Sequence, residues 1–248
     1  MDPRIRRRRI EVRRDEGRRR LRLLVAGVVV LVLTGAIWFG LRSPLLDVDR
    51  VTVRGAEYSS VEHVREAAGI PVGQPLVDVD LEGARVAVEA LPWVDRARIQ
   101  RVWPSTVLVT VTERTASAVT STNTSEWAVL DGSGRVLELV PERPPGLLVL
   151  EGLGEAPRPG ATVTSADGPL RVFAALSPSL AARTLAVVAL EGGQIELKLN
   201  PQGTVRMGPV EGVVAKARAA ETVLASVDVR NLAVLDVRLP SSPVLTRA

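Results

Sequence analysis

The stretch LLVAGVVVLVLTGAIWFGL, residues 23–41, decides how this 248-residue chain is organised, because no charged side chain occurs in it. At a rise of ~1.5 Å per residue, a helix from Leu23 to Leu41 would reach about 28 Å, close to the hydrocarbon thickness of a bilayer. Trp38 lies near one end, where amphipathic rings suit the membrane interface, and Pro44 cannot continue the helix. The stretch therefore predicts one transmembrane helix.

Two other interpretations of this stretch explain it less well. A buried core helix would carry polar residues at a helical period, whereas Thr34 is the one polar side chain in the run. A cleaved signal peptide would have a shorter apolar core followed by a small-x-small site, and the sequence RSPL at residues 42–45 is a poor one.

The charge of the chain is concentrated before the apolar stretch. Residues 1–22 contain eleven arginines and four acids, which gives +7, while the whole chain carries +4. By the positive-inside rule this segment is a cytoplasmic tail, and residues after about Pro44 lie outside the cytoplasm. A nucleic-acid-binding arm would usually interleave aromatic side chains, which this segment lacks, so membrane topology explains the arginines better.

The region after the apolar stretch begins with a strand and a short helix. Residues 45–54 largely alternate apolar and polar side chains with one slip at residues 49–50, which predicts a strand with a bulge or a late start. Ser59 stands three residues before Glu62, a spacing typical of a helix N-terminal capping box, and Gly69 ends the helical pattern.

A second helix and two strands complete this region. The helix is expected to begin at Asp78 or Asp80, either of which can cap it. Residues 94–102 and 107–113 then read as two strands joined by a turn at residues 103–106. The predicted order is strand, helix, helix, strand, strand within about seventy residues.

The remaining residues, 116–248, predict a β-rich region with two helices. The run DGSGR at residues 131–135, between strand-like residues 126–130 and 136–140, is a strong hairpin signal. The other expected strands are 147–150, 185–190, 194–199, 204–207, 232–239 and 244–247, and the expected helices are 170–176 and 212–227. The fold class is therefore α+β.

The sequence offers no set of residues for catalysis or metal binding. His63 is the single histidine and the chain has no cysteine, so a metal site built on those ligands is not expected. No phosphate-binding or dinucleotide-binding motif occurs, and the serine at position 133 sits in a predicted hairpin rather than in a nucleophile elbow. We predict no catalytic residue, no metal site and no cofactor.

A series of short motifs nevertheless follows in a specific order along the chain. The series comprises VTVRG (51–55), GQPL (73–76), LPWV (91–94), RVWPSTV (101–107) and VTER (111–114). It closely resembles the POTRA domain of the bacterial cell-division family FtsQ, called DivIB in many Gram-positive bacteria. Further on, WAVLD (127–131) and LDVR (235–238) look like strands of that family's β domain.

The resemblance implies the organisation of the whole chain. It comprises a basic tail (1–22), a transmembrane helix (23–41), a POTRA domain (46–115) and a β domain (116–248). It also implies a non-enzymatic divisome scaffold in the cell membrane at the division septum. Such a scaffold binds the bitopic coiled-coil proteins FtsL and FtsB (DivIC) and links them, with other divisome components, to septal peptidoglycan synthesis.

The resemblance also implies where a partner binds. In this family the partner adds a strand to the edge formed by the last strands, a mode in which backbone hydrogen bonds supply affinity and alternate side chains supply selectivity. Carried over, the contact residues are Arg238, Leu239, Ser241, Ser242, Val244, Leu245 and Arg247. An ordinary terminal strand would contain the same residue types, and that alternative stays open.

Three further interpretations come from the sequence. A POTRA-bearing accessory protein of a secretion or membrane-assembly system is the alternative function, although that class usually has tandem POTRA repeats. A membrane-anchored cell-wall enzyme would need converging acids that the sequence does not show. Trp93 and Trp103, each next to a proline, are expected to serve packing and turn formation.

Overall fold

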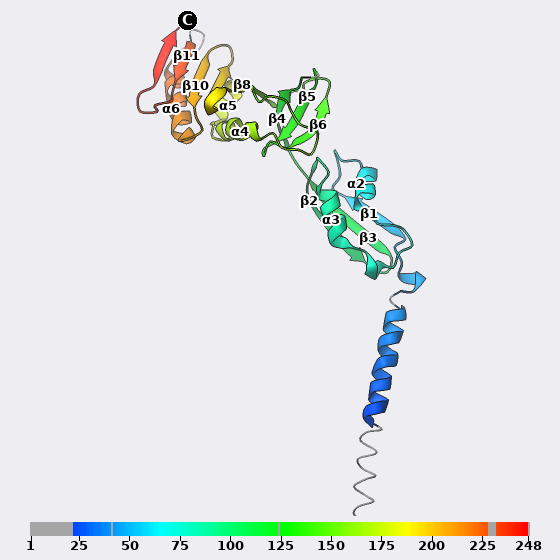
Figure 1. The fold of residues 1–248 in the computed structure, drawn as a ribbon. Helices are drawn as coiled ribbons and strands as arrows, with labels where there is room; N and C mark the ends of the chain where they lie inside the picture. The colour runs from blue at the N-terminus through cyan, green and yellow to red at the C-terminus, as the bar shows by residue number, and fades with distance from the viewer. Residues whose placement is uncertain (1–21, 41, 124, 228–231, 248) are drawn as a thin grey trace, which may run out of the picture.

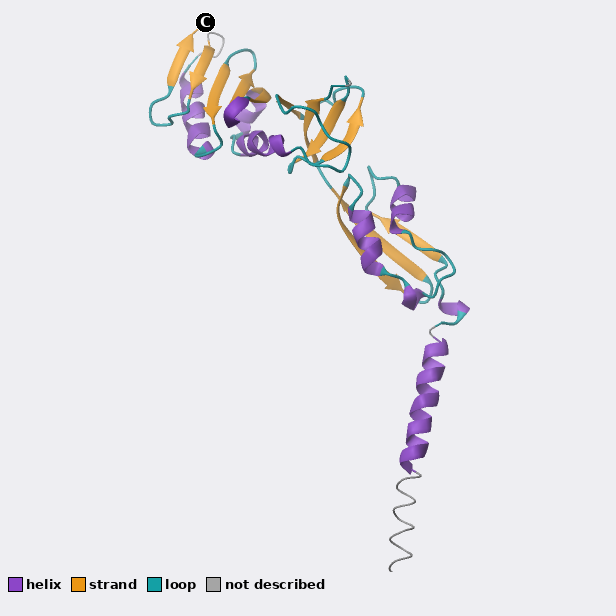
Figure 2. Cartoon of the chain, viewed as in Figure 1, coloured by secondary structure: helices purple, strands orange, loops and turns teal. Residues whose placement is uncertain are grey.

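The computed structural model describes residues 22–40, 42–123, 125–227 and 232–247. Along the chain it shows an N-terminal helix, a small three-stranded unit and a larger unit built on nine strands (Figures 1 and 2). The predicted α+β class is confirmed. The predicted basic tail lies outside the described residues apart from Arg22, and so do Leu41 and Ala248.

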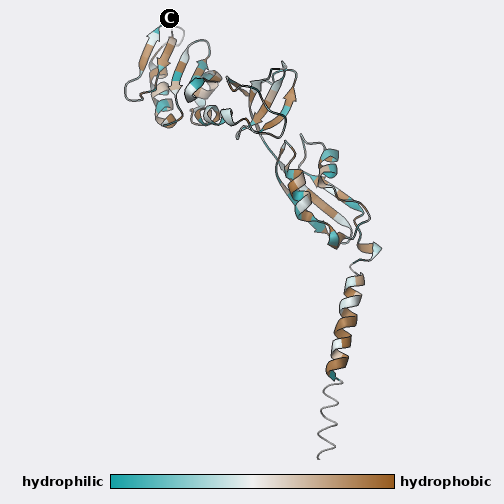
Figure 3. Ribbon diagram, in the orientation of Figure 1, coloured by the Kyte–Doolittle hydropathy of each residue, from teal (hydrophilic) through white to brown (hydrophobic). Residues whose placement is uncertain are grey.

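The N-terminal helix, Arg22–Gly40, matches the predicted transmembrane stretch. It has nineteen residues, long enough to cross a bilayer, and its apolar side chains are exposed rather than packed. Figure 3 shows that hydrophobic residues predominate along it. Exposure of large aliphatic side chains along a whole helix is costly in water and favourable in lipid. The helix is therefore consistent with a single membrane crossing.

The small unit, which we call the βααββ unit, follows the predicted order of elements. After the short helix η1 (Pro44–Leu46) come β1 (Arg50–Arg54), α2 (Val61–Ala68), η2 (Leu76–Asp78), α3 (Leu81–Glu89), β2 (Val94–Val102) and β3 (Thr106–Glu113). Its sheet has the order β1-β3-β2, with β1 parallel and β2 antiparallel to β3. Strand β1 begins only at Arg50, so the slip in its alternation marks a late start.

Hydrogen bonds at the helix ends explain where the two helices of this unit begin. Ser60, not the predicted Ser59, caps α2, because its Oγ accepts the backbone N–H of Glu62 at 3.2 Å. Ser59 is instead held through its backbone N–H, which donates to the Glu113 carboxylate at 2.6 Å. Asp80 caps α3 by accepting a backbone N–H of its first turn at 2.9 Å.

The larger unit, the nine-stranded unit, contains the remaining elements. They are β4 (Ala116–Ser121), β5 (Trp127–Asp131), β6 (Val136–Val140), β7 (Leu148–Glu151), η3 (Thr164–Ala166), α4 (Asp167–Ala174), α5 (Pro178–Arg183), β8 (Thr184–Ala189), η4 (Glu191–Gly193), β9 (Ile195–Leu199), β10 (Thr204–Gly208), α6 (Val213–Ser226), β11 (Leu232–Asp236) and β12 (Val244–Arg247). The strand order is β12-β11-β10-β9-β8-β7-β4-β5-β6. Helices α4, α5 and α6 pack on one face, over a core that includes Leu150, Leu197 and Met207.

All eight strands predicted for this unit are present, but β4 was not predicted. Strand β11 ends at Asp236, three residues before the predicted end. Helix α5 was not predicted from the sequence: it has only six residues, too few to show a helical period, although Ser177 caps it and a proline opens it.

The two units meet through a short junction between β3 and β4. Arg114, between these strands, donates from Nη1 to Oδ2 of Asp131 at 2.8 Å and from Nε to the carbonyl of Val94 at 3.0 Å. Trp93 of the βααββ unit packs against a small cluster of the nine-stranded unit that includes Leu137. A largely buried ion pair and an aromatic contact thus join the units.

Candidate functional site

The C-terminal strand β12 forms one end of the nine-stranded sheet. It pairs antiparallel with β11, with Val244 opposite Asp236 and Leu245 opposite Leu235. Within the described residues no strand lies on the other side of β12. An edge strand presents backbone groups that another strand can pair with.

The opposite end of the sheet is different, because a loop covers part of it. Val136 on β6 donates its N–H to Ala161 and accepts the N–H of Gly160, both at 2.8 Å. Val163 donates in the same way to the carbonyl of Gly134 at 2.8 Å. Part of the β6 edge is therefore satisfied within the chain, which leaves β12 as the more open edge.

The side chains of β12 are mostly exposed. Val244 and Arg247 are exposed, whereas Leu245 packs partly against the main core. The strand is therefore anchored by one apolar side chain while the rest of it stays accessible. Such an arrangement leaves an apolar side chain, Val244, on the surface beside open backbone groups.

The turn that leads into β12 carries the other predicted contact residues. Arg238 follows β11, and its guanidinium donates to the Asp236 carboxylate, with Nη2 to Oδ2 at 2.6 Å. Leu239 is exposed, and its carbonyl accepts the N–H of Ser242 at 3.0 Å, which closes the turn. Together with Val244 these residues line a hollow of about 310 Å³.

The charge in this hollow is balanced locally. The hydrogen bonds from Arg238 lower the pKa of Asp236 more than partial burial raises it. The same contact raises the pKa of Arg238. Both groups therefore stay ionised at neutral pH, and the guanidinium is held beside the open edge.

The structure brings together the residues that the sequence suggested. Arg238, Leu239, Ser241 and Ser242 lie in the turn, and Val244, Leu245 and Arg247 lie on β12. The sequence analysis missed Asp236, which orients Arg238. The spacing of two residues between them, which places both side chains on one face of an extended chain, was the available signal.

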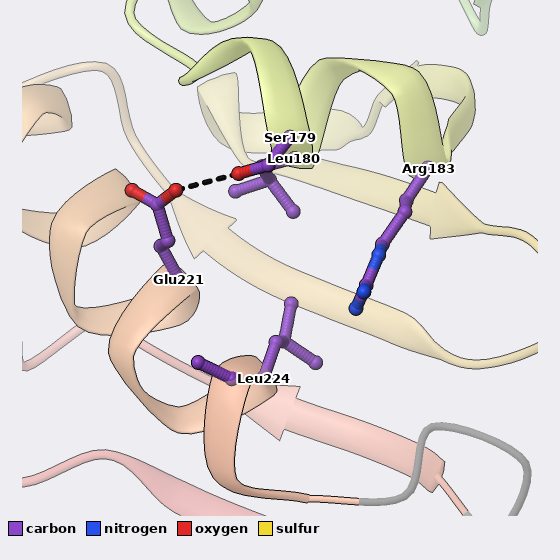
Figure 4. A pocket seen from close by; sticks show the side chains of 6 residues that line it. Ser179, Leu180, Arg183, Glu221 and Leu224 are labelled. Carbon is purple, nitrogen blue, oxygen red and sulfur yellow. Dashed lines mark hydrogen bonds between the residues drawn. The ribbon is translucent and has the colours of Figure 1, made fainter.

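A second hollow, of about 180 Å³, lies between α5 and α6 (Figure 4). Glu221 on α6 accepts hydrogen bonds from Oγ of Ser177 and Oγ of Ser179, each at 2.6 Å. These hydroxyls lower the pKa of Glu221. Because Ser177 also caps α5, the contact ties the start of this short helix to α6, which explains the cluster structurally.

The two tryptophans next to prolines have different surroundings. Trp93 stacks on Tyr58, with ring centroids 4.6 Å apart, and borders a groove of about 440 Å³ that exposed His63 also lines. Trp93 packs as predicted. Trp103 forms the predicted turn, but the packing expected of it is wrong, because its side chain is 51% exposed.

The described part of the chain contains no group of three or more histidine, cysteine, aspartate or glutamate residues arranged to hold a metal ion. The β12 edge with its adjoining turn is the candidate functional surface, because the open backbone groups of an edge strand can pair with another strand.

Two protein families match the chain. The family described as POTRA domain, FtsQ-type, matches residues 46–114. The family described as cell division protein FtsQ/DivIB, C-terminal, matches residues 118–238. Together the two matches extend from η1 through the end of β11.

Two FtsQ proteins of Streptomyces agree with this pair of matches. The chain is 32% identical over 240 residues to the cell division protein FtsQ of Streptomyces collinus, covering 93% of this chain and 90% of that protein. It is 31% identical over 231 residues to FtsQ of Streptomyces coelicolor, covering 89% and 86% of the two chains. A solved extracytoplasmic domain of DivIB from Geobacillus stearothermophilus aligns with 49% of this chain and 98% of that chain, at 15% identity and a TM-score of 0.34.

Proposed function

Because the chain belongs to the FtsQ/DivIB family of non-catalytic cell-division proteins, we propose that it is a scaffold of the division complex. It binds small bitopic proteins of the FtsL and FtsB/DivIC type and links them to septal peptidoglycan synthesis. The observation that carries the proposal is the open β12 edge at the end of the nine-stranded sheet.

The proposed organisation has four parts. Residues 1–22 form a cytoplasmic basic tail, residues 23–41 cross the membrane once, and the POTRA domain (46–115) and β domain (116–248) lie outside the cytoplasm at the septum. The excess of arginine before the helix supports this orientation. The family matches at residues 46–114 and 118–238 support the division into two domains.

The proposed contact is strand addition at β12. A partner strand pairs with the open side of Val244–Arg247, and backbone hydrogen bonds supply most of the affinity. The side chain of Val244 and the hollow beside it select the partner, since a short apolar side chain on the partner fits there. The alternative of a secretion or membrane-assembly accessory protein is less well supported, because the β-domain match is to a division family.

The test compares two valine variants of the full chain. Val244→Asp places a charge on the proposed contact, whereas Val214→Asp makes the same change on α6, where the valine is 53% exposed against 61% for Val244. Burying one valine contributes ~1.5 kcal/mol, which is about tenfold in affinity. Tagged full-length chain would be purified from detergent extracts of its own host, and the small coiled-coil membrane proteins recovered with it would be quantified.

We expect Val244→Asp to recover about tenfold less partner than the parent, and Val214→Asp to recover as much as the parent. Deletion of residues 240–248 should abolish recovery. Equal recovery by the two valine variants would place the contact elsewhere on the scaffold. If the parent itself recovers no FtsL-type or FtsB-type protein, the scaffold function is refuted.

A further inference from the structure

One end of the βααββ unit exposes several large apolar side chains. Four exposed side chains lie there: Leu45 in η1, Val72 in the loop after α2, Val102 at the end of β2 and Trp103 in the turn that follows. Val72, for example, is 70% exposed. Clusters of exposed apolar groups on a folded unit usually mark a contact surface. We call these four residues the apolar tip.

Backbone hydrogen bonds show that the residues of the apolar tip come together. The N–H of Gly73 donates to the carbonyl of Val48 at 2.8 Å, and the N–H of Val48 donates to the carbonyl of Gln74 at 2.9 Å. The N–H of Asp49 donates to the carbonyl of Ser105 at 2.8 Å. The loop carrying Val72 and the turn carrying Trp103 therefore flank the same short segment, just after η1.

This end of the unit adjoins the N-terminal helix (Figure 1). The guanidinium of Arg42 lies over the ring of Trp38 at 4.7 Å from its centroid and pairs with the Asp78 carboxylate at 3.0 Å. Leu45 follows Gly40 by five residues, so an extended chain keeps it within about 18 Å of the helix end. The apolar tip thus lies at the end of the βααββ unit that is next to the helix.

We infer that the apolar tip docks on the bilayer surface from which the helix emerges, with its side chains among the lipid headgroups. The inference rests on the proposed single membrane crossing. Aliphatic side chains are stabilised at this depth because they reach the acyl chains. Tryptophan is stabilised there because its ring is apolar while its N–H stays near hydrated headgroups. The five-residue tether holds the tip next to lipid at high effective concentration, which favours a bilayer over a diffusing protein partner.

The charges around the tip do not select anionic lipid. Asp49 and Arg50 at the start of β1 offset each other, and Asp78 is paired with Arg42. Docking therefore depends on the apolar side chains. It sets the tilt of the βααββ unit against the membrane and so the height at which the β12 edge is presented.

The chain contains no cysteine, so a spin label can be placed at one position at a time. Labels at Val72→Cys and Val102→Cys report the tip, and both variants keep Trp103. Val61→Cys at the start of α2 is the matched control, since Val61 is 42% exposed and Val102 is 44% exposed. Val30→Cys reports the helix. The full chain is reconstituted at one copy per lipid nanodisc, and label collisions with oxygen and with a water-soluble nickel complex are measured.

We expect nickel access at positions 72 and 102 to be several-fold lower than at position 61, with position 30 inaccessible to nickel. Nickel access at 72 and 102 equal to that at 61, with 30 protected, would overturn docking while leaving the membrane crossing intact. Full nickel access at position 30 would overturn the crossing itself, and docking with it. The two failures are therefore distinguishable.

A second pair of variants tests whether the indole ring of Trp103 anchors the apolar tip to the bilayer. In the Val72→Cys background, Trp103→Ser should raise nickel access several-fold. Tyr58→Ser, which removes an exposed ring from the α2 side of the unit, should leave it unchanged. Equal responses to the two substitutions would also overturn the inference.

Discussion

Replacing Asp131 by asparagine should loosen the junction between the two units by about 2 kcal/mol. Asp131 is buried, and its Oδ1 accepts hydrogen bonds from Ser133 N–H, Ser133 Oγ and the N–H of Arg135, at 2.7–2.9 Å. Its Oδ2 accepts the 2.8 Å bond from Arg114. Asparagine keeps the size and one acceptor oxygen, but its amide turns N–H groups toward the guanidinium.

The magnitude follows from what asparagine loses. The bonds to Oδ1 can persist, so the main loss is one charge-assisted hydrogen bond, ~1.5–3 kcal/mol. Breaking a fully buried ion pair costs ~3–5 kcal/mol, but the Arg114 side chain is 20% exposed and water can partly solvate it. A value of about 2 kcal/mol corresponds to a roughly 30-fold change in the opening equilibrium.

Asp95 provides the matched control. Its carboxylate also faces Arg114, at 3.5 Å, but its side chain is 40% exposed. Exposed ion pairs contribute ~0–1 kcal/mol, so Asp95→Asn should cost less than about 0.5 kcal/mol. Hydrogen exchange of peptides that cover β4 and β5, measured on the full chain in detergent micelles, gives the local free energy of opening.

The pH dependence separates electrostatics from packing. Burial raises the pKa of Asp131, but the hydrogen bonds from Ser133, Arg135 and Arg114 together outweigh it, so the net pKa lies below the ordinary value. The stabilisation is thus present above about pH 4, the unfolded pKa, and is lost as the pH falls through the lower folded pKa. The difference between the parent and Asp131→Asn should shrink over that range.

Two outcomes would contradict a charge-stabilised junction. One is an equal loss of the free energy of opening in Asp131→Asn and Asp95→Asn. The other is a cost for Asp131→Asn that does not change with pH, which would mean that size and packing, not charge, hold the junction.

Two further substitutions test the βααββ unit, again by hydrogen exchange of the full chain. Gly55→Ala should cost more than ~2 kcal/mol of stability, because the residue has φ +80° and a Cβ would lie 2.2 Å from the carbonyl oxygen of Val111. The control Gly73→Ala, at φ +89° with open space around it, should cost only the ~1 kcal/mol of backbone strain. Equal costs for the two variants would contradict the predicted clash. Arg101→Lys should cost ~1–3 kcal/mol of stability, because the guanidinium donates to three backbone carbonyls around η2. The control Arg98→Lys, on the exposed side of the same strand, should be within ~0.5 kcal/mol of the parent. An unchanged stability of Arg101→Lys would show that these bonds do not stabilise η2.

The sequence by itself determined the elements that depend on near neighbours. The apolar run before Leu41, the turn at residues 131–135 and the helix stop at Gly69 were read correctly, because periodicity, turn chemistry and capping act over a few residues. Helix α5 escaped detection for the same reason, since six residues are too few for a period to show.

Only the tertiary structure decided how those elements pair. Strand β1 lies parallel to β3 although Val107 follows its partner Val51 by 56 positions, and no local pattern specifies that choice. Trp93 and Trp103 look alike in the sequence, each beside a proline, yet one packs between the units and the other is exposed on the apolar tip. The open side of β12 is likewise a property of the whole sheet. Burial and edge position depend on which distant segments cover a residue, and that is settled by long-range packing of the core.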